Sequence, residues 1–253
     1  QRAALAISRT LMWPALADIT SGLSLVDEPQ IIRHYDLLTA QDNLRDRLAT
    51  DTVVHLGGRF VSKPLLQFID HTAPRRFFHI TDSGLVLDPL HRVTDRLACD
   101  LSALAEFLKG HSPSPESHGY LSTWINASSA AAEVLNEIEA GQSELTEPVL
   151  PRVLARRLDP DFAIFAASSL PIRDLNTYPP AGAGILKADA NRGASGIDGL
   201  IASACGYAEG TGKKTLLLIG DQAFLHDVNS LPLLHKTALP LTVIVINNNG
   251  GRI

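Results

Sequence analysis

Short apolar runs alternate with helical patterns along the chain, and this alternation predicts an α/β fold. Five runs have the length and composition of strands: Thr52–Leu56, Arg76–Thr81, Phe162–Ala166, Thr215–Ile219 and Leu241–Ile246. Strands that alternate with helices favour mainly parallel sheets. The last two runs are apolar at nearly every position, which is typical of strands in a sheet covered on both faces.

Helical periodicity fills much of the sequence between these runs. An apolar stripe covers Leu101–Leu108, with Asp100 near its start. The alanine-rich segment Trp124–Leu135 is also expected to be helical. Apolar residues spaced along Phe224–Leu234 predict one helix between the last two strands.

One segment has the composition of a linker. His111–His118 holds two prolines and three serines, which suits an extended connection. We therefore expect two Rossmann-like three-layer domains, residues 1–110 and 119–253, joined by a linker at 111–118. The chain opens on Gln1 without a secretory signal and stops soon after the last apolar run. We expect it to be cut from a longer polypeptide, with an incomplete second domain.

The composition narrows the function classes. Of the 253 residues, 45% are hydrophobic and 19% are charged, with a net charge of −5. Basic residues are scattered rather than grouped, so we expect no nucleic-acid partner. No run approaches the roughly 18 apolar residues of a membrane span. Cys99 and Cys205 lack metal-ligand spacing, so both are expected to be buried small hydrophobic residues in a reducing compartment.

The most informative polar residues follow the last two predicted strands. Gly220-Asp221 ends one strand, and Asn248 follows the next, with a helical pattern between them. In such βαβ units the parallel strands are commonly neighbours, and ligands bind at their carboxyl ends. We therefore expect Asp221 and Asn248 to point into one crevice.

These two side chains offer the oxygen ligands that Mg²⁺ binds together with phosphate oxygens and water. Gly220 permits close approach of the backbone, and the amides of Gln222 and Ala223 near a predicted helix start would donate to phosphate. The alternative is an acid and an amide at strand ends that share no ligand, as in many α/β proteins.

Longer segments resemble one known family. Residues 191–199 (NRGASGIDG) are similar to a signature of the MenD family of 2-succinyl-5-enolpyruvyl-6-hydroxy-3-cyclohexene-1-carboxylate (SEPHCHC) synthases, as are residues 220–231 (GDQAFLHDVNSL) and 247–251 (NNNGG). Gly220-Asp221 with Asn248 also resembles the diphosphate-and-metal motif of thiamine-diphosphate enzymes. Gln222 stands where the wider superfamily often has glycine. The likeness covers nearly the whole chain and is weakest across residues 110–147.

The resemblance implies the thiamine-diphosphate-enzyme fold, with residues 1–110 as the central, transhydrogenase-like domain and residues 119–253 as the cofactor domain. It implies two cofactors, thiamine diphosphate and Mg²⁺ (or Mn²⁺). The metal ligands would be Asp221, Asn248 and the carbonyl of Gly250. The residues expected at the cofactor are Ser169, Ser195, Gly196, Ile197, Gly220, Asp221, Gln222, Ala223 and Asn248.

Catalytic roles for Ile197, Arg173 and Arg192 also come from the resemblance. Ile197 would be the apolar wedge beneath the cofactor; the alternative is a core isoleucine in a loop. Arg173 and Arg192 would bind the carboxylates of 2-oxoglutarate and isochorismate, because guanidinium pairs bidentately with carboxylate; the alternative is two surface arginines. Ser169 would lie near the diphosphate or substrate, or would cap a helix.

The implied reaction is a transfer: 2-oxoglutarate is decarboxylated, and its succinyl-semialdehyde unit is added to isochorismate in menaquinone or phylloquinone biosynthesis. In this superfamily a glutamate from a separate pyrimidine-binding domain, usually of a second subunit, completes the site. No segment here supplies that domain, so we expect the isolated chain to be inactive and the parent to be a homodimer or homotetramer. The expected location is the cytoplasm, or the plastid for a plant or algal parent.

Other readings stay open. Another thiamine-diphosphate lyase or synthase, similar to acetolactate synthase, would share the metal motif but lack NRGASGIDG. A non-catalytic binding or regulatory module would keep the fold alone. Gly57-Gly58-Arg59 hints at a nicotinamide dinucleotide loop but lacks the full glycine spacing. Asp227, near a helix start, is expected to be a cap rather than a catalyst.

Overall fold

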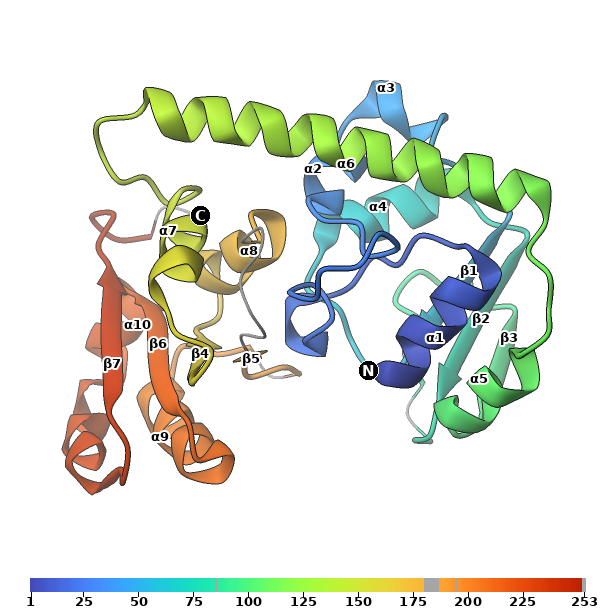
Figure 1. The fold of residues 1–253 in the computed structure, drawn as a ribbon. Coiled ribbons are helices and arrows are strands. Elements are labelled where there is room, and N and C mark those ends of the chain that lie inside the picture. Colours follow the sequence, from blue (N-terminus) through green and yellow to red (C-terminus); the bar gives the residue numbers. More distant parts are fainter. Residues whose placement is uncertain (85, 180–186, 194, 252–253) are drawn as a thin grey trace. The chain divides into compact units, whose positions relative to one another are not determined.

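The computed structural model describes residues 1–84, 86–179, 187–193 and 195–251 (Figure 1). The chain forms two compact units. The first holds Gln1–Ala17 and Asp27–Gln142, and the second holds Asp18–Val26 and Ser143–Ile253. Each unit has a parallel sheet with helices, which confirms the predicted α/β class.

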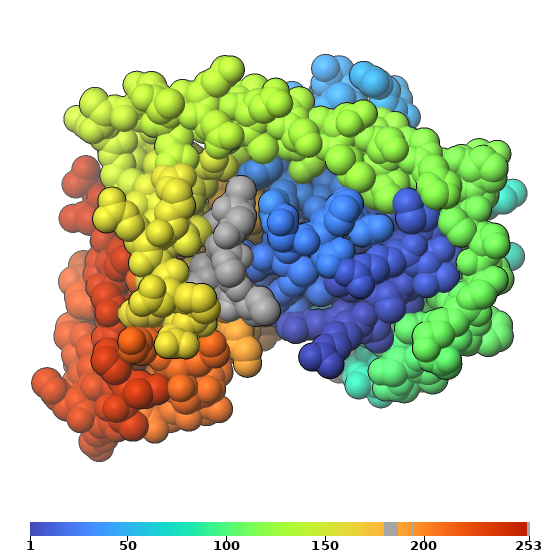
Figure 2. Space-filling view, viewed as in Figure 1, coloured from blue at the N-terminus to red at the C-terminus, as the bar shows by residue number. Residues whose placement is uncertain are grey.

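The first unit is built on a parallel sheet in the order β1-β2-β3. Its elements are α1 (Arg2–Leu11), α2 (Tyr35–Thr39), α3 (Asp42–Arg45), β1 (Thr52–Leu56), α4 (Lys63–Thr72), β2 (Arg76–Thr81), β3 (Asp95–Ala98), α5 (Leu101–Leu108) and α6 (Pro115–Gly141). Trp124 of α6 is 1% exposed and meets Phe68 of α4 edge to face, with ring centroids 5.9 Å apart. Such a pair adds about 1 kcal/mol beyond the area it buries. The opposite side of α6 lies on the surface (Figure 2).

The predicted linker at residues 111–118 overlaps the start of α6: residues 111–114 precede the helix, and residues 115–118 form its first turn. The Ser114 side chain accepts a hydrogen bond from the Ser117 amide at 3.3 Å, and Pro115 occupies the first turn. Serine before a helix and proline in its first turn are favoured because they satisfy or remove unpaired amide donors. Ser114 and Pro115, which suggested an extended connection, therefore begin a helix, and the compact units divide after Gln142 instead.

The second unit is built on a parallel sheet in the order β5-β4-β6-β7. Its elements are η1 (Ile19–Ser21), α7 (Leu150–Arg157), β4 (Phe162–Ala166), α8 (Leu170–Thr177), β5 (Lys187–Asp189), α9 (Leu200–Thr211), β6 (Lys214–Gly220), α10 (Asp221–His226), η2 (Val228–Lys236) and β7 (Leu241–Ile246). All five predicted strands are present within one residue of their expected bounds. The short strands β3 and β5 were not predicted, because each has few apolar residues.

Strand β6 is covered on both faces, as its continuous apolar run predicted. Leu217 and Ile219 pack into one apolar cluster with α9. Their neighbours Leu216 and Leu218, which face the other side, are at most 3% exposed. Strand β7 differs from the prediction: within the described residues it pairs on one side only, and none of its side chains is buried, with Val245 39% exposed.

Two further expectations need correction. The single helix expected over residues 224–234 is two short elements, α10 and the 3₁₀ helix η2, which contains Pro232. Proline inside a helix removes a backbone donor, and Asp227 separates the two elements. Of the cysteines, Cys205 is buried as expected, whereas Cys99 is only partly buried.

Candidate functional site

Four loops of the second unit follow neighbouring parallel strands, and each carries predicted site residues. Ser169 follows β4, Arg192 follows β5, Asp221 follows β6 and Asn248 follows β7. Because the four strands are parallel, their carboxyl ends share one edge of the sheet, which we call the carboxyl edge (Figure 1).

The carboxyl edge contains a topological switch point. Strand β4 connects through α8 to β5 on one side, and β6 connects through α10 and η2 to β7 on the other side. Right-handed crossovers put these connections on opposite faces of the sheet. The switch lies between β4 and β6, the position at which open α/β sheets bind ligands. Ser169 and Asp221 follow these two strands.

Asp221 begins α10 directly after β6 and is partly exposed. Its Oδ1 accepts a hydrogen bond from the Gln222 amide at 2.7 Å. That amide is therefore engaged with Asp221, and its donation to a phosphate stays a prediction. Ala223 is 5% exposed and packs into the apolar cluster of α9, which holds the turn against the core.

The loop after β7 turns sharply and contacts the loop after β6. Asn249, Gly250 and Gly251 have φ angles of 64°, 77° and 61°, the left-handed region. The Asn249 amide donates to Oδ1 of Asn247 at 3.1 Å. A Cβ at position 250 would lie 2.8 Å from Nε2 of Gln222. Glycine at 250 thus suits both the turn and the close approach of the two loops.

The donor set of these loops fits a magnesium ion held with a diphosphate. Asp221 would contribute a carboxylate, Asn248 an amide oxygen and Gly250 a backbone carbonyl, and the strands that these residues follow are neighbours. These are hard oxygen donors of the kind that Mg²⁺ binds beside phosphate and water. Asn248 donates its Nδ2 to Oε1 of Glu147 at 3.0 Å, so its oxygen remains for a ligand.

Ser169, after β4, has a strained backbone. Its φ and ψ of 77° and −135° are rarely adopted by residues other than glycine. It occupies the N-cap position of α8, but its side chain forms no capping hydrogen bond, which disfavours the capping alternative. Strain of about 1–3 kcal/mol persists where the surrounding structure enforces it, and it clusters at functional sites.

Two acids near this edge were missed by the sequence analysis. Burial raises the pKa of Asp174 to about 7, with a further increase from Glu147 and an opposing effect of Arg173. Asp174 therefore binds a proton in the neutral range. Arg173 beside it is exposed on α8. No motif marks either acid, and Glu147 lies 101 residues from its partner Asn248 in the sequence.

The loop that joins β5 to α9 carries the NRGASGIDG motif and is exposed. Arg192, Ser195, Gly196 and Ile197 are all exposed, Ile197 to 40%; Ala194 lies outside the described residues. This exposure argues against the alternative that Ile197 is a core residue. A Cβ at position 196 would meet the carboxylate of Asp198, so a larger residue there would require that exposed side chain to move.

Asp227 anchors the end of this loop. It is 7% exposed, and its Oδ2 accepts a hydrogen bond from the Ile201 amide at 2.6 Å. Its Oδ1 accepts a second one from the Ser230 hydroxyl at 2.7 Å. Asp227 is a cap, as predicted, but of the neighbouring helix α9. It thereby ties the loop after β5 to the helix after β6.

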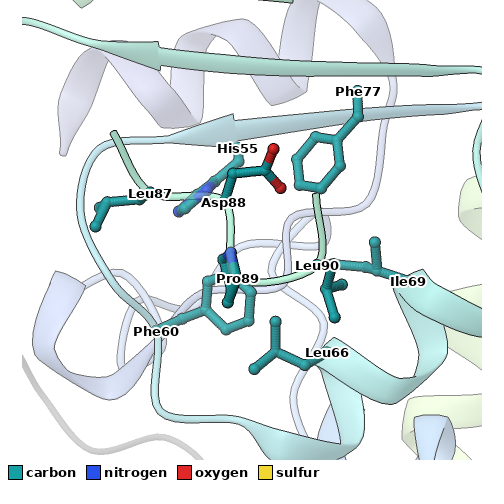
Figure 3. Close-up of a pocket in the computed structure, with 9 residues that line it drawn as sticks. All are labelled: His55, Phe60, Leu66, Ile69, Phe77, Leu87, Asp88, Pro89 and Leu90. Carbon is teal, nitrogen blue, oxygen red and sulfur yellow. The ribbon is translucent and has the colours of Figure 1, made fainter. Parts of the chain in front are cut away.

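The glycine pair at the end of β1 has a different environment. The Gly57 and Gly58 carbonyls accept hydrogen bonds from Nε2 of His79 and His55 at 2.9 and 2.6 Å. The adjacent cavity is about 20 Å³, enough for about one water, and is lined mainly by apolar side chains that include Phe60 (Figure 3). This small apolar cavity disfavours dinucleotide binding at the glycine pair.

Within the described part of the chain, no helix is long and apolar enough to span a membrane.

Comparison with known proteins agrees with the resemblance. The chain is 40% identical over 252 residues to 2-succinyl-5-enolpyruvyl-6-hydroxy-3-cyclohexene-1-carboxylate synthase of Rubrobacter xylanophilus, covering 99% of this chain and 44% of that protein. It is 35% identical over 251 residues to the synthase of the same name from Listeria innocua, covering 98% and 43%. Protein PHYLLO, chloroplastic, of Arabidopsis thaliana is 34% identical over 281 residues, covering 99% and 16%.

The chain spans less than half the length of these relatives. The two bacterial relatives carry the name of the synthase family whose signature the NRGASGIDG segment resembles. A family model described as "Middle domain of thiamine pyrophosphate" matches residues 1–166, which is more than half of the chain. The chain therefore belongs to the thiamine pyrophosphate enzyme family defined by that middle domain, and its relatives are SEPHCHC synthases of the MenD type.

Proposed function

We propose that the full-length gene product is a SEPHCHC synthase. It decarboxylates 2-oxoglutarate with thiamine diphosphate and Mg²⁺ (or Mn²⁺) and transfers the four-carbon unit to isochorismate. The observation that carries this proposal is the carboxyl edge, where residues of four family-like loops follow four neighbouring parallel strands. The names of the bacterial relatives support the reaction.

The metal ligands in this proposal are Asp221, Asn248 and the carbonyl of Gly250. Magnesium there would hold the diphosphate and neutralise part of its charge. Gly220 leaves room for the backbone near the diphosphate, and Gln222 and Ala223 line the same turn. Thiamine diphosphate, when bound, supplies an acceptor for the electron pair released as carbon dioxide leaves.

Ile197 orients the cofactor in this proposal. Its side chain is 40% exposed, and covering it with the cofactor would remove apolar surface from water, which is favourable by about 25 cal/mol per Å². Ser195 and Gly196 precede it in the same exposed loop. Ser169 contributes a hydroxyl that forms no capping bond.

Arg173 and Arg192 bind substrate carboxylates. They follow the neighbouring strands β4 and β5, and both are exposed. Guanidinium groups bind carboxylates in a bidentate way, and both substrates are dicarboxylates. Asp174, whose pKa is raised to about 7 mainly by burial, bears less negative charge near Arg173 than an ordinary aspartate and so opposes anionic substrates less.

The complete site needs a second subunit. We propose that a pyrimidine-binding domain of the partner supplies the activating glutamate, in a homodimer or homotetramer, and that residues 1–253 alone are inactive. The cytoplasm is the proposed location, or the plastid if the parent is a plant or algal protein, since one relative is described as chloroplastic.

The test is an assay of the full-length gene product with thiamine diphosphate, Mg²⁺, 2-oxoglutarate and isochorismate. The expected result is consumption of isochorismate that depends on all the other components. Condensation of pyruvate without use of isochorismate would indicate an acetolactate synthase-like enzyme. A protein that binds neither thiamine diphosphate nor Mg²⁺ in calorimetric titration would be a non-catalytic module.

A further inference from the structure

Glu147 contacts the proposed metal site from a distant part of the sequence. Its Oε1 accepts a hydrogen bond from Nδ2 of Asn248 at 3.0 Å, and both side chains are partly buried. Beside the larger effect of burial, the charge of Glu147 raises the pKa of Asp174 of α8, so the two acids lie near each other. Glu147 therefore joins the loop after β7 to the turn that leads into α7.

The position of Glu147 is fixed by its backbone. Its carbonyl accepts a hydrogen bond from the Leu150 amide at 3.3 Å, at the start of α7. Leu150 and Leu154 of that helix are 8% and 7% exposed. Because α7 is anchored in the core of the unit, the turn that carries Glu147 leads directly into a packed helix, which restricts the carboxylate beside Asn248.

The chemistry of this contact sets which end of the Asn248 amide faces outward. A carboxylate oxygen accepts hydrogen bonds, so the amide must present its NH₂ group to Glu147. The amide oxygen then points to the opposite side. Without an acceptor at position 147, the amide could rotate by half a turn and present NH₂ groups to a cation, which an NH₂ group cannot ligate.

We propose that Glu147 is a positioning residue that orients the Asn248 amide so that its oxygen is available to the divalent metal. The inference rests on the proposed function, because it concerns the same ligand set. Mutation of a residue that hydrogen-bonds to a metal ligand commonly lowers metal affinity by about 10- to 100-fold. Mutation of Glu147 should therefore lower the affinity for the metal, and this effect should require Asn248.

The experiment measures Mn²⁺ binding to the full-length gene product by the loss of the free-ion EPR signal, with thiamine diphosphate at a fixed saturating concentration. Glu147→Met keeps the length of the side chain but removes the oxygen acceptor, and should raise the Kd for Mn²⁺ about tenfold or more. Glu147→Gln keeps an amide oxygen as acceptor and should stay within about threefold of wild type. Glu144→Ala, which removes an exposed acid of the same segment, should bind Mn²⁺ like wild type.

A double-mutant cycle separates positioning from a general loss of structure. In the Asn248→Ala background, Glu147→Met should add less than about threefold, because the residue through which it acts is gone. Equal effects of Glu147→Met in both backgrounds, or wild-type affinity in Glu147→Met, would overturn the inference while leaving the proposed function intact. Failure of the wild-type protein itself to bind Mn²⁺ with the cofactor would overturn both. Thermal melting without metal identifies any variant that does not fold, and a Glu147→Gln variant that folds but binds as weakly as Glu147→Met would also contradict the inference.

Discussion

The two units share a parallel α/β design, but the carboxyl ends of their strands differ. In the first unit, His55 and His79 stack with ring centroids 4.8 Å apart, and both donate to loop carbonyls. In the second unit, Asp221 is partly exposed and Ile197 is 40% exposed. At one edge the two imidazoles form hydrogen bonds within the protein, and at the other an acid and an apolar side chain remain accessible, as our proposed cofactor site requires.

This contrast separates fold from function. A glycine pair after a strand occurs in the first unit, yet its carbonyls accept hydrogen bonds from imidazoles, and the cavity beside it has room for only about one water. The same fold therefore does not imply the same function, which depends on the residues in the loops after the strands. If ligand binding depends on the second edge, substitutions there should lower activity more than matched substitutions elsewhere in the unit.

The largest expected effect is at the proposed metal ligand. Asp221→Ala should lower SEPHCHC formation by the full-length protein more than about 100-fold, because losing a ligand should cost at least as much as losing a group behind one. The matched control is Asp161→Ala, an exposed acid just before the amino end of β4. Steady-state rates with both substrates check this. Similar losses in the two variants would place the chemistry elsewhere.

Asp227→Ala should reduce stability more than activity. It removes a buried acceptor that caps α9 through the Ile201 amide, and loss of such a cap costs about 2 kcal/mol at the upper end of the usual range. Urea unfolding of the full-length protein should show a lower midpoint for the transition that reports the second unit. Asp159→Ala, an exposed acid of the same unit, serves as the control. An unchanged midpoint for Asp227→Ala would contradict its role as an anchor.

Ile197→Ala should reduce activity more than stability. Because the side chain is exposed, stability should stay within about 0.5 kcal/mol of wild type, while loss of the wedge should lower kcat/KM about tenfold, or 1.4 kcal/mol. Ile164→Ala in the same unit is the contrast, since Ile164 is 2% exposed and should lose about 2–5 kcal/mol of stability. Calorimetry and kinetics on both variants decide the matter. A large stability loss in Ile197→Ala with unchanged kinetics would return Ile197 to a structural role.

The smallest effects are opposite pH dependences of the two units. Burial lowers the pKa of His55 from 6.5, so the unfolded state takes up protons first and stability falls as the pH drops below about 6.5. Burial raises the pKa of Asp174 to about 7 from 3.8, so the folded state binds the proton first and stability rises as the pH drops from about 7 towards 4. His55→Phe should flatten the first trend, and Asp174→Asn the second, in melting curves taken across this range. If the dependence of stability on pH persists in these variants, it arises from titration of other groups.

Much of the fold could be predicted because apolar runs mark buried strands directly. β4 and β6 were found this way, whereas β5 escaped because it is three residues long and contains Lys187 and Asp189. Serine and proline before α6 were misread, since the same residues serve linkers and helix starts. Local patterns cannot show which distant helix an acid will cap, as for Asp227.

The candidate site divides in the same way. Asp221 and Asn248 each follow an apolar strand, and a helical pattern lies between the strands. This βαβ pattern was enough to predict that both residues lie at the same edge of the sheet. The Glu147–Asn248 contact depends on how α7 packs in the unit. Nothing in the sequence around Glu147 signals that packing, and the resemblance to the family is weakest there.

The segment Asp18–Val26 affects when the second unit can fold during synthesis. It belongs to the second unit, where Ile19 is fully buried and its amide donates to Asn176, 157 residues later in the chain, at 3.0 Å. During synthesis this segment emerges long before its partners, so the second unit cannot close until Asn176 has left the ribosome. A fragment that starts at Ser143 would lack an interior piece of its own unit, and adding a peptide of residues 18–26 should restore its compactness.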